Sequence, residues 1–177
     1  MTLPDYRQLS HWMATVDDDL TPRPSLAGDI DVDVAIVGAG FTGLWTAYYL
    51  ATTDPTLRIA VLEKEIAGFG ASGRNGGWCS ALFPQSIGTL ARRHGRGPAI
   101  AMHRAMVGSV DEVGRAAAAE GIECDFVKGG TVVLARSELQ LGRARDEVVE
   151  SDDYGLGLAL LSRDEARARL DATNVLG

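Results

Sequence analysis

A chain of 177 residues can bury the core of one ordinary domain, or at most of two small ones. Its net charge of -7 argues against a nucleic-acid partner, because binding to phosphates needs clustered cations. With 46% apolar residues the composition is typical of a soluble globular protein, and the apolar runs are too short to span a bilayer. We therefore expect no transmembrane segment. The N-terminus resembles no signal peptide, so the expected location is cytoplasmic.

The cysteine content and the one basic cluster give little indication of function. Cys79 and Cys124 are too few for a disulfide framework and suit a reducing compartment. Neither has a second cysteine or a histidine at ligand spacing, so we expect no metal site. The cluster of arginines at residues 92–96, which includes His94, is interpreted as a solvated loop or helix start.

Residues 1–30 are predicted to form an arm rather than a domain. Three of the six prolines and the acidic run Asp17–Asp19 fall here, among scattered apolar residues. The apolar part of this stretch is concentrated around His11, Trp12 and Met13. We expect these three residues to anchor the arm on the body of the protein.

A strand, a helix and a second strand follow the arm. The apolar run Val32–Val37 is typical of a strand buried on both faces of a parallel sheet. Residues 41–52 predict a helix that Asp54–Pro55 ends, and residues 58–62 predict a second buried strand. Together they form a βαβ unit.

The chain then changes from a loop to a long helix. Residues 66–80 are crowded with glycine, serine and asparagine and predict a loop. A helix is expected from Gly97–Pro98 to Gly121. Its predicted buried face is formed by apolar residues that recur at helical spacing: Met102, Met106, Val110, Val113 and Ala117.

The last third mixes predicted antiparallel strands with helices. Residues 122–126 and 131–135 predict a β-hairpin, and residues 158–161 a short strand. Capping boxes that begin at Ser137 and Ser162 predict two further helices, to about residues 153 and 170. This change places a boundary near residue 120, with a nucleotide-binding domain over 31–120 and the beginning of a second domain over 121–177.

The strongest motif is the glycine turn between the first strand and the helix. Gly38-Ala39-Gly40-Phe41-Thr42-Gly43 fits the pattern G-x-G-x-x-G of dinucleotide sites. Gly38 would allow the tight turn, Gly40 would let a pyrophosphate approach the backbone, and Gly43 would let the helix lie against the sheet. The phosphates would then meet the N-terminus of the helix.

An acidic residue completes this motif. Glu63 ends the second strand, twenty residues after Gly43, where it would accept hydrogen bonds from ribose hydroxyls and repel the 2′-phosphate of NADP. The alternative is a plain glycine turn with a surface glutamate. The order and spacing of strand, glycines, helix and acid favour a dinucleotide site.

The loop that follows favours FAD over NAD. Gly70–Gly77 supplies bare backbone, the hydroxyl of Ser72 and the guanidinium of Arg74. Such a loop could surround a second stretch of phosphate and let a flat ring system lie against the main chain. The alternative is a flexible surface loop.

At these residues the sequence resembles the D-amino-acid-oxidase-like FAD-dependent oxidoreductases, and within them the gamma-glutamylputrescine oxidoreductase branch. The resemblance rests on Asp33–Gly43, on Val61–Lys64 and on Gly70–Gly77, and it is diffuse beyond about residue 80. The arm around Trp12 is also similar to that branch.

The resemblance implies an α/β fold in which a Rossmann-like FAD-binding βαβ domain precedes the start of an α+β substrate domain. It implies a flavoenzyme that oxidises the C–N bond of an amine or amino acid by hydride transfer to the flavin. The residues carried over to the cofactor site are Gly38, Gly40, Phe41, Thr42, Gly43, Glu63, Lys64, Ser72, Arg74, Asn75, Gly76 and Gly77. Some relatives attach the flavin through a histidine in this loop, and none is present here, so the FAD is expected to be noncovalent.

Two alternatives to this enzyme stay open at the level of sequence. One is an NAD-linked dehydrogenase, and the other is a truncated, non-catalytic flavin-fold module. Because members of the family are more than twice as long, we expect an N-terminal fragment that is incomplete and inactive alone. His94 and His103 are more typical of structural or solvated histidines than of a catalytic pair, and no catalytic residue is assigned.

Overall fold

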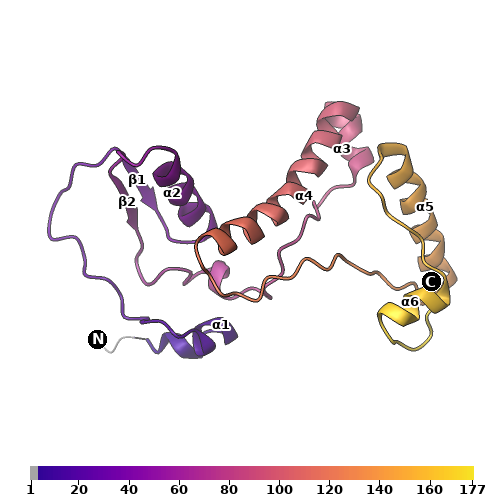
Figure 1. The fold of residues 1–177 in the computed structure, drawn as a ribbon, viewed down its shortest axis with the longest axis horizontal. Helices are drawn as coiled ribbons and strands as arrows, with labels where there is room; N and C mark the ends of the chain where they lie inside the picture. Colours follow the sequence, from indigo (N-terminus) through magenta and orange to yellow (C-terminus); the bar gives the residue numbers. More distant parts are fainter. Residues whose placement is uncertain (1–3) are drawn as a thin grey trace. The chain divides into compact units, whose positions relative to one another are not determined.

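The computed structural model describes residues 4–177, which form two compact units (Figure 1). The first unit runs to Trp78 and the second is Cys79–Gly177. The predicted arm begins in residues 1–3, which lie outside the described residues. The predicted domain boundaries near residues 30 and 120 stay predictions.

The first unit contains the predicted βαβ arrangement. Strand β1 (Val34–Val37) pairs in parallel with β2 (Ile59–Leu62), and helix α2 (Phe41–Thr53) connects them. Just before each strand, the guanidinium of Arg58 donates to both carboxylate oxygens of Asp33, at 3.0 and 3.1 Å. This ion pair fixes the register at the N-terminal ends of the two strands, opposite the glycine turn. The strand–helix–strand prediction is confirmed.

The prediction that the strands are buried on both faces is wrong within this unit. Along β1, Val34 and Ile36 are half-buried, whereas Ala35 and Val37 are exposed, Val37 by 87%. Helix α2 packs on one side of the two strands, where Ile36 lies against Gly43. A continuous apolar run therefore shows that a strand is suited to burial, but the elements that cover it decide whether burial occurs.

The N-terminal stretch folds against the loop that follows β2. It forms a 3₁₀ turn η1 (Tyr6–Gln8) and a short helix α1 (His11–Thr15), capped by the hydroxyl of Ser10. Tyr6 and Met13 are 5% exposed and form a small core with Ile66. The expectation that the stretch around Trp12 anchors the arm is confirmed.

The second unit is helical. It contains α3 (Ile87–His94), α4 (Arg96–Ala119), α5 (Glu138–Tyr154) and α6 (Arg163–Arg169). Helices α3 and α4 pack together. The predicted buried face of α4 is confirmed at Val110 and Ala117, whereas Met102 is 42% exposed.

Two local predictions in this unit are confirmed only in part: the setting of the basic cluster and the form of one capping box. Arg92, Arg93 and His94 form the last turn of α3, where cations complement the helix dipole. All members of the cluster are exposed, as predicted, but only Arg96 stands at a helix start, as the first residue of α4. Both predicted caps are present. Ser162 and Glu165 form a reciprocal capping box, whereas Gln140 accepts from the N–H of Arg136 instead of completing the box with Ser137.

The predicted hairpin and the short strand are absent from the described structure. Residues 122–136 and 156–161 are described in full and contain no strand. Val127 and Val133 are 85% and 83% exposed, whereas Ala135 is buried and the ring of Phe126 lies against Gly114 of α4. An isolated two-stranded ribbon is only marginally stable without a third strand or a covering helix. Of this stretch, Ala135 pairs with the C-terminal residues, through its N–H to the carbonyl of Gly177 at 2.8 Å.

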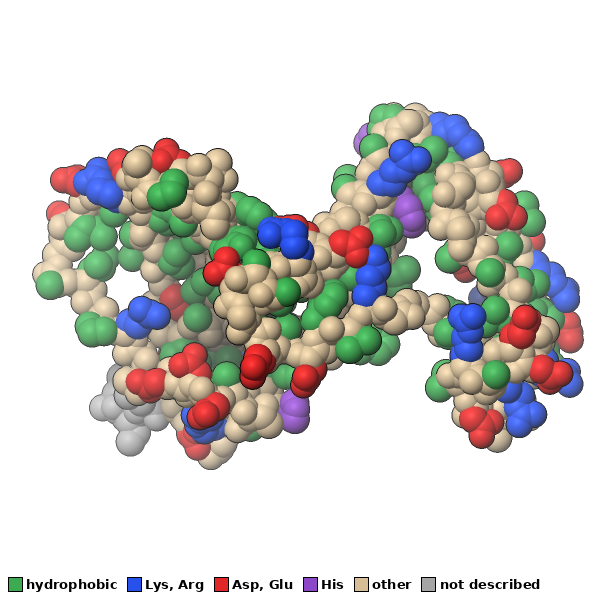
Figure 2. Space-filling view, in the orientation of Figure 1, with side chains coloured by type: hydrophobic (Ala, Val, Ile, Leu, Met, Phe, Trp, Pro, Cys, Tyr) green, Lys and Arg blue, Asp and Glu red, His purple; other side chains and the backbone are tan. Residues whose placement is uncertain are grey.

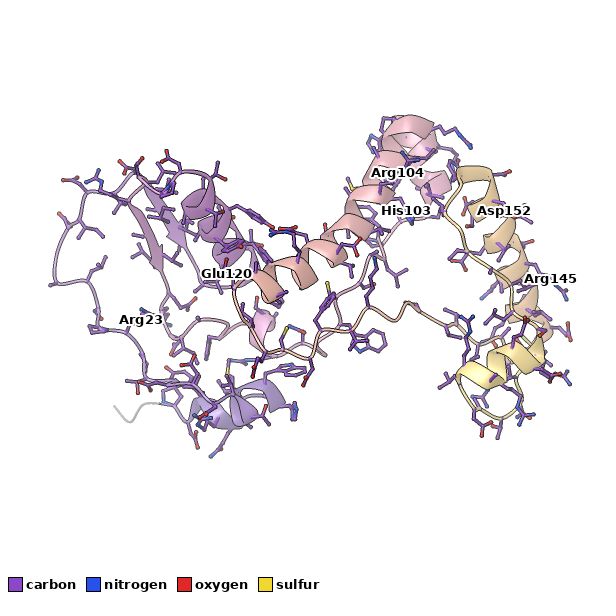
Figure 3. All side chains as sticks on the ribbon, in the orientation of Figure 1. Arg23, His103, Arg104, Glu120, Arg145 and Asp152 are labelled. Atoms are coloured by element: carbon purple, nitrogen blue, oxygen red, sulfur yellow. The ribbon has the colours of Figure 1, made fainter. Side chains whose placement is uncertain are left out.

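Acidic and basic side chains are interspersed on the visible face of α5 and α6 (Figure 2). Arg145 and Asp152, for example, both project from α5 (Figure 3). Such mixed charge is typical of a solvated helix surface.

Candidate functional site

The glycine turn leaves β1 in a conformation that only glycine adopts easily. Gly38 has φ +99°, and its N–H donates to the carbonyl of Leu62 at 2.7 Å. At Gly43, an added Cβ would lie 2.0 Å from the carbonyl oxygen of Gly38 and 3.2 Å from a methyl of Ile36. The helix therefore packs directly on the turn and strand, as the motif predicts for its first and third glycines.

Glu63 is bound to the same turn. Its Oε2 accepts from the N–H of Ala39 at 2.8 Å, and its Oε1 accepts from the N–H of Glu65 at 3.1 Å. The Ala39 N–H is the main cause of a lowered pKa for this carboxyl. The side chain is exposed, and each carboxylate oxygen can accept a further hydrogen bond. The site thus presents an ionised acceptor beside the glycine turn.

The loop after β2 returns to the N-terminus of α2. The hydroxyl of Ser72 accepts from the N–H of Phe41 at 2.9 Å, and the N–H of Gly68 donates to the carbonyl of Ala39 at 2.8 Å. An added Cβ at Gly40 would lie 3.1 Å from the oxygen of Ser72. The two segments that sequence proposed separately are therefore one structural site.

Other residues assigned to the loop have different positions. The side chain of Asn75 is used within the loop: it donates to the carbonyl of Ser72 at 2.6 Å and accepts from the N–H of Gly77 at 2.7 Å. The guanidinium of Arg74 lies 4.6 Å from the ring centroid of Phe69. Asn75 therefore shapes the loop, and Arg74 is held over a ring.

The remaining candidates are mostly open to solvent. An added Cβ at Gly76 would meet nothing within 4 Å, whereas Gly77, with φ +73°, lies against the indole of Trp12. Thr42 is exposed in the first turn of α2. The side chain of Lys64 is 90% exposed, with its ammonium 4.0 Å from Glu65.

Comparison with known proteins identifies the family. A family model described as "FAD dependent oxidoreductase" (DAO) matches residues 33–177. The chain belongs to this family. The match covers most of the chain and begins just before β1, so it includes the glycine turn, Glu63 and the loop.

Several known proteins are similar to this chain. Gamma-glutamylputrescine oxidoreductase of Escherichia coli is 30% identical over 82% of the chain and 34% of its own length. A probable oxidoreductase, OrdL, of Haemophilus influenzae is 32% identical over 73% of the chain and 28% of its length. The beta subunit of sarcosine oxidase from Rhizobium meliloti is 56% identical over 24% of the chain and 10% of its length. No solved structure matches the chain significantly.

These matches support the resemblance to the gamma-glutamylputrescine oxidoreductase branch. They also show what share of each relative this chain corresponds to. The chain spans about a third of the length of gamma-glutamylputrescine oxidoreductase and of OrdL. Anything that depends on the rest of those proteins, including their substrates, is therefore a proposal for this chain.

The residues present fit the adenosine and pyrophosphate part of FAD, the cofactor of the family. The glycine turn exposes bare backbone at the N-terminus of α2, where an anion is favoured. Glu63 offers acceptors for two ribose hydroxyls. The hydroxyl oxygen of Ser72 accepts from the N–H of Phe41, and this bond leaves the hydroxyl proton of Ser72 available for donation to a phosphate.

Sequence reasoning missed several residues that build this site. The backbone groups of Ala39 and Gly68 are central to it, and Gly68 has φ +73°. Ala39 lies inside the glycine motif, but no pattern in the sequence indicates that its N–H donates to Glu63. Tyr6 was not singled out, and Trp12 was predicted to anchor the arm but not to reach this loop. Their hydrogen-bond partners lie 59 and 63 residues away along the chain.

The described residues contain neither a helix long and apolar enough to cross a membrane nor a cluster of three metal-ligating side chains. The cytoplasmic location expected from the sequence stays a prediction.

Proposed function

We propose that the protein is an FAD-dependent oxidoreductase that oxidises a C–N bond of a small amine or amino acid, and that this chain supplies the first part of its flavin site. The observation that carries the proposal is the meeting of three features at one helix N-terminus: the glycine turn, the ionised Glu63 and the Ser72 loop. A plain surface turn would not need all three. The family match adds independent support.

The names of the relatives favour the C–N bond as the site of reaction. Gamma-glutamylputrescine and sarcosine both carry a nitrogen next to an oxidisable carbon, and they are the substrates that two of these names give. We infer a substrate of this class for the present protein. When bound, FAD would supply the hydride acceptor for such an oxidation.

Each proposed cofactor residue has a defined task. Gly38 and Gly43 hold the turn close to the sheet, and Gly40 leaves the approach to the backbone open. Glu63 would orient the adenosine ribose, and its charge would disfavour a 2′-phosphate. Ser72 would donate to a phosphate while it accepts from Phe41.

The loop beyond Ser72 would continue toward the flavin ring. Arg74 would add positive charge, and Gly76 and Gly77 would allow a flat ring close to the main chain. Asn75 would act by holding the loop in its turn, because both ends of its amide bind loop backbone. No histidine lies in this loop, which supports noncovalent attachment.

We assign no acid–base residue to the reaction. His94 ends α3, and His103 lies on α4 (Figure 3). Both belong to the second unit. The flavin carries the redox chemistry, so the task of the chain is binding and orientation.

The test is a cofactor titration of the protein with FAD and with NAD, followed by calorimetry and flavin absorbance. We expect selective binding of FAD that Gly40→Val abolishes, because the new side chain would occupy the approach of the pyrophosphate to the backbone and crowd the oxygen of Ser72. Gly28→Val is the matched control, since an added Cβ at Gly28 meets nothing within 4 Å. Binding of NAD without FAD would refute the proposal and favour the dehydrogenase.

A further inference from the structure

The arm and the proposed flavin loop form one packed structure within the first unit. Tyr6 and Met13 share a small core with Ile66, which begins the loop, and Phe69 packs on its edge. The hydroxyl of Tyr6 also donates to a carboxylate oxygen of Glu65 at 2.9 Å. The arm is therefore bound to the start of the loop by both apolar and polar contacts.

Trp12 contacts the far end of the same loop. Its indole N–H donates to the carbonyl of Asn75 at 2.7 Å. Its six-membered ring covers Gly77 so closely that an added Cβ there would lie 2.6 Å from Cζ2 and 2.9 Å from Cη2. The loop backbone is thus held by one hydrogen bond and one ring face, next to the turn in which Gly77 has φ +73°.

Between these two points the arm also meets the middle of the loop. A Cβ at Gly73 would lie 2.9 Å from the methyl of Met13. The ring of Tyr6 meets Phe69 edge to face, and Arg74 lies over the same ring at 4.6 Å. Burial and the hydrogen bond to Glu65 raise the pKa of Tyr6, so it stays a donor at neutral pH.

These contacts have the pattern of a clamp. They involve backbone at Asn75, Gly77 and Gly73, so they restrict the path of the main chain and not just its side chains. Asn75 and Gly77 both belong to the stretch proposed to approach the flavin. The arm itself is braced by Arg7, which donates to the carbonyls of Val16 and Asp18 at 2.9 and 3.0 Å.

We propose that the N-terminal arm is a clamp that fixes the conformation of the loop 66–77 for flavin binding, with Trp12 as its positioning residue. The proposal rests on the proposed FAD site, and it assigns Trp12 no contact with substrate or cofactor. It predicts that the loop is preorganised before the cofactor arrives. Preorganisation of this kind raises affinity because less ordering remains to be done on binding.

The experiment is made on the whole enzyme to which this chain contributes, and it compares the wild-type protein with Trp12→Ala and Trp12→Phe in two measurements. Hydrogen exchange of the amides in residues 68–77, without cofactor, reports the order of the loop. A calorimetric titration with FAD, at a temperature where all variants are folded, reports affinity. In Trp12→Ala we expect loop exchange about tenfold faster and FAD affinity about tenfold weaker, because both the hydrogen bond and the ring contact are lost.

Trp12→Phe separates the two contacts. It keeps an aromatic ring beside Gly77 and removes the N–H donor, so we expect about a threefold loss of affinity, partly rescued relative to alanine. Trp45→Phe is the matched control. Trp45 lies on α2 against Tyr48 and Tyr49, and its substitution should leave exchange in the loop unchanged.

The outcomes are distinguishable. If the wild-type protein binds FAD and Trp12→Ala binds it equally well, the clamp is refuted and the flavin site stands. A lower melting temperature with unchanged FAD affinity would show a merely structural role and also refute it. If the whole enzyme to which this chain contributes binds no FAD, the proposed function fails, and the role of the clamp in flavin binding fails with it.

Discussion

Gly43→Ala is the substitution for which the structure and helix propensity predict opposite signs. Alanine in place of glycine inside a helix ordinarily stabilises it by about 1 kcal/mol. Gly43 lies in the first turn of α2, so propensity alone predicts a small gain. The structure predicts a loss, because the new Cβ would lie 2.0 Å from the carbonyl oxygen of Gly38.

The size of that loss follows from the geometry. Ordinary contact begins at 3.4 Å, so the helix must retreat from the turn by about 1.4 Å, the difference between 3.4 and 2.0 Å. The obstacle is backbone and not the end of a flexible side chain. Because backbone yields little, the cost lies in the upper part of the range for overpacking, at about 2–3 kcal/mol. Subtraction of the propensity gain of about 1 kcal/mol leaves a net loss of about 1–2 kcal/mol.

The assay uses the position of the tryptophans. All three, Trp12, Trp45 and Trp78, lie in the first unit, so their emission during urea denaturation reports the unfolding of that unit. Gly108→Ala is the matched control, because Gly108 lies in α4 with nothing within 4 Å of an added Cβ. It should stabilise the second unit, as followed by circular dichroism. A Gly43→Ala chain as stable as the wild type would refute the proposed close contact of helix and turn.

Further predictions concern Glu63 and Ser72 at the flavin site and the ion pair of Asp33 with Arg58 at the opposite ends of the two strands. Glu63→Gln should weaken FAD binding by about tenfold or more, the loss for a hydrogen bond to a charged group, as measured by flavin fluorescence. The N–H of Ala39 lowers the pKa of Glu63, so wild-type affinity should be constant above pH 4.5 and fall only below it. Arg58 lowers the pKa of Asp33 from 3.8 to about 2, so its stabilisation of the first unit should be complete above pH 3.8 and be lost as the pH falls toward 2. Asp33→Asn should remove that pH dependence in tryptophan-monitored unfolding, and persistence of the dependence would contradict the assignment. Ser72→Ala should lower the unfolding free energy of the first unit by about 1 kcal/mol, because the N–H of Phe41 loses an acceptor that water replaces in part.

The sequence alone determined the features that depend on near neighbours. The apolar runs, the helix between them and its end at Asp54–Pro55 predicted the βαβ unit closely. Ser137 and Ser162 predicted where two helices begin. Gly38 predicted a tight turn out of the first strand, and its φ in the structure is positive. Each of these is decided by backbone geometry or by hydrogen bonds within a few residues, so the information is local.

In the candidate site, the position of Glu63 could be predicted from the sequence, whereas the hydrogen bonds of the loop could not. The spacing from Gly43 to Glu63 placed the carboxylate at the end of β2, next to the turn. The sequence did not predict that the N–H of Ala39 would bind it, nor that the amide of Asn75 would bind its own loop instead of a ligand. Those choices depend on which groups a folded loop brings within about 3 Å.

Only the tertiary structure decided the features that need a distant partner. Trp12 reaches Asn75 across 63 residues, and Phe41 finds Ser72 across 31. Conversely, residues 122–135 have the pattern of a hairpin but no covering layer, and they form none. Val37 is exposed for the same reason, although its sequence context is that of a buried strand. Burial and strand pairing are properties of two surfaces in contact, and a sequence pattern specifies only one of them.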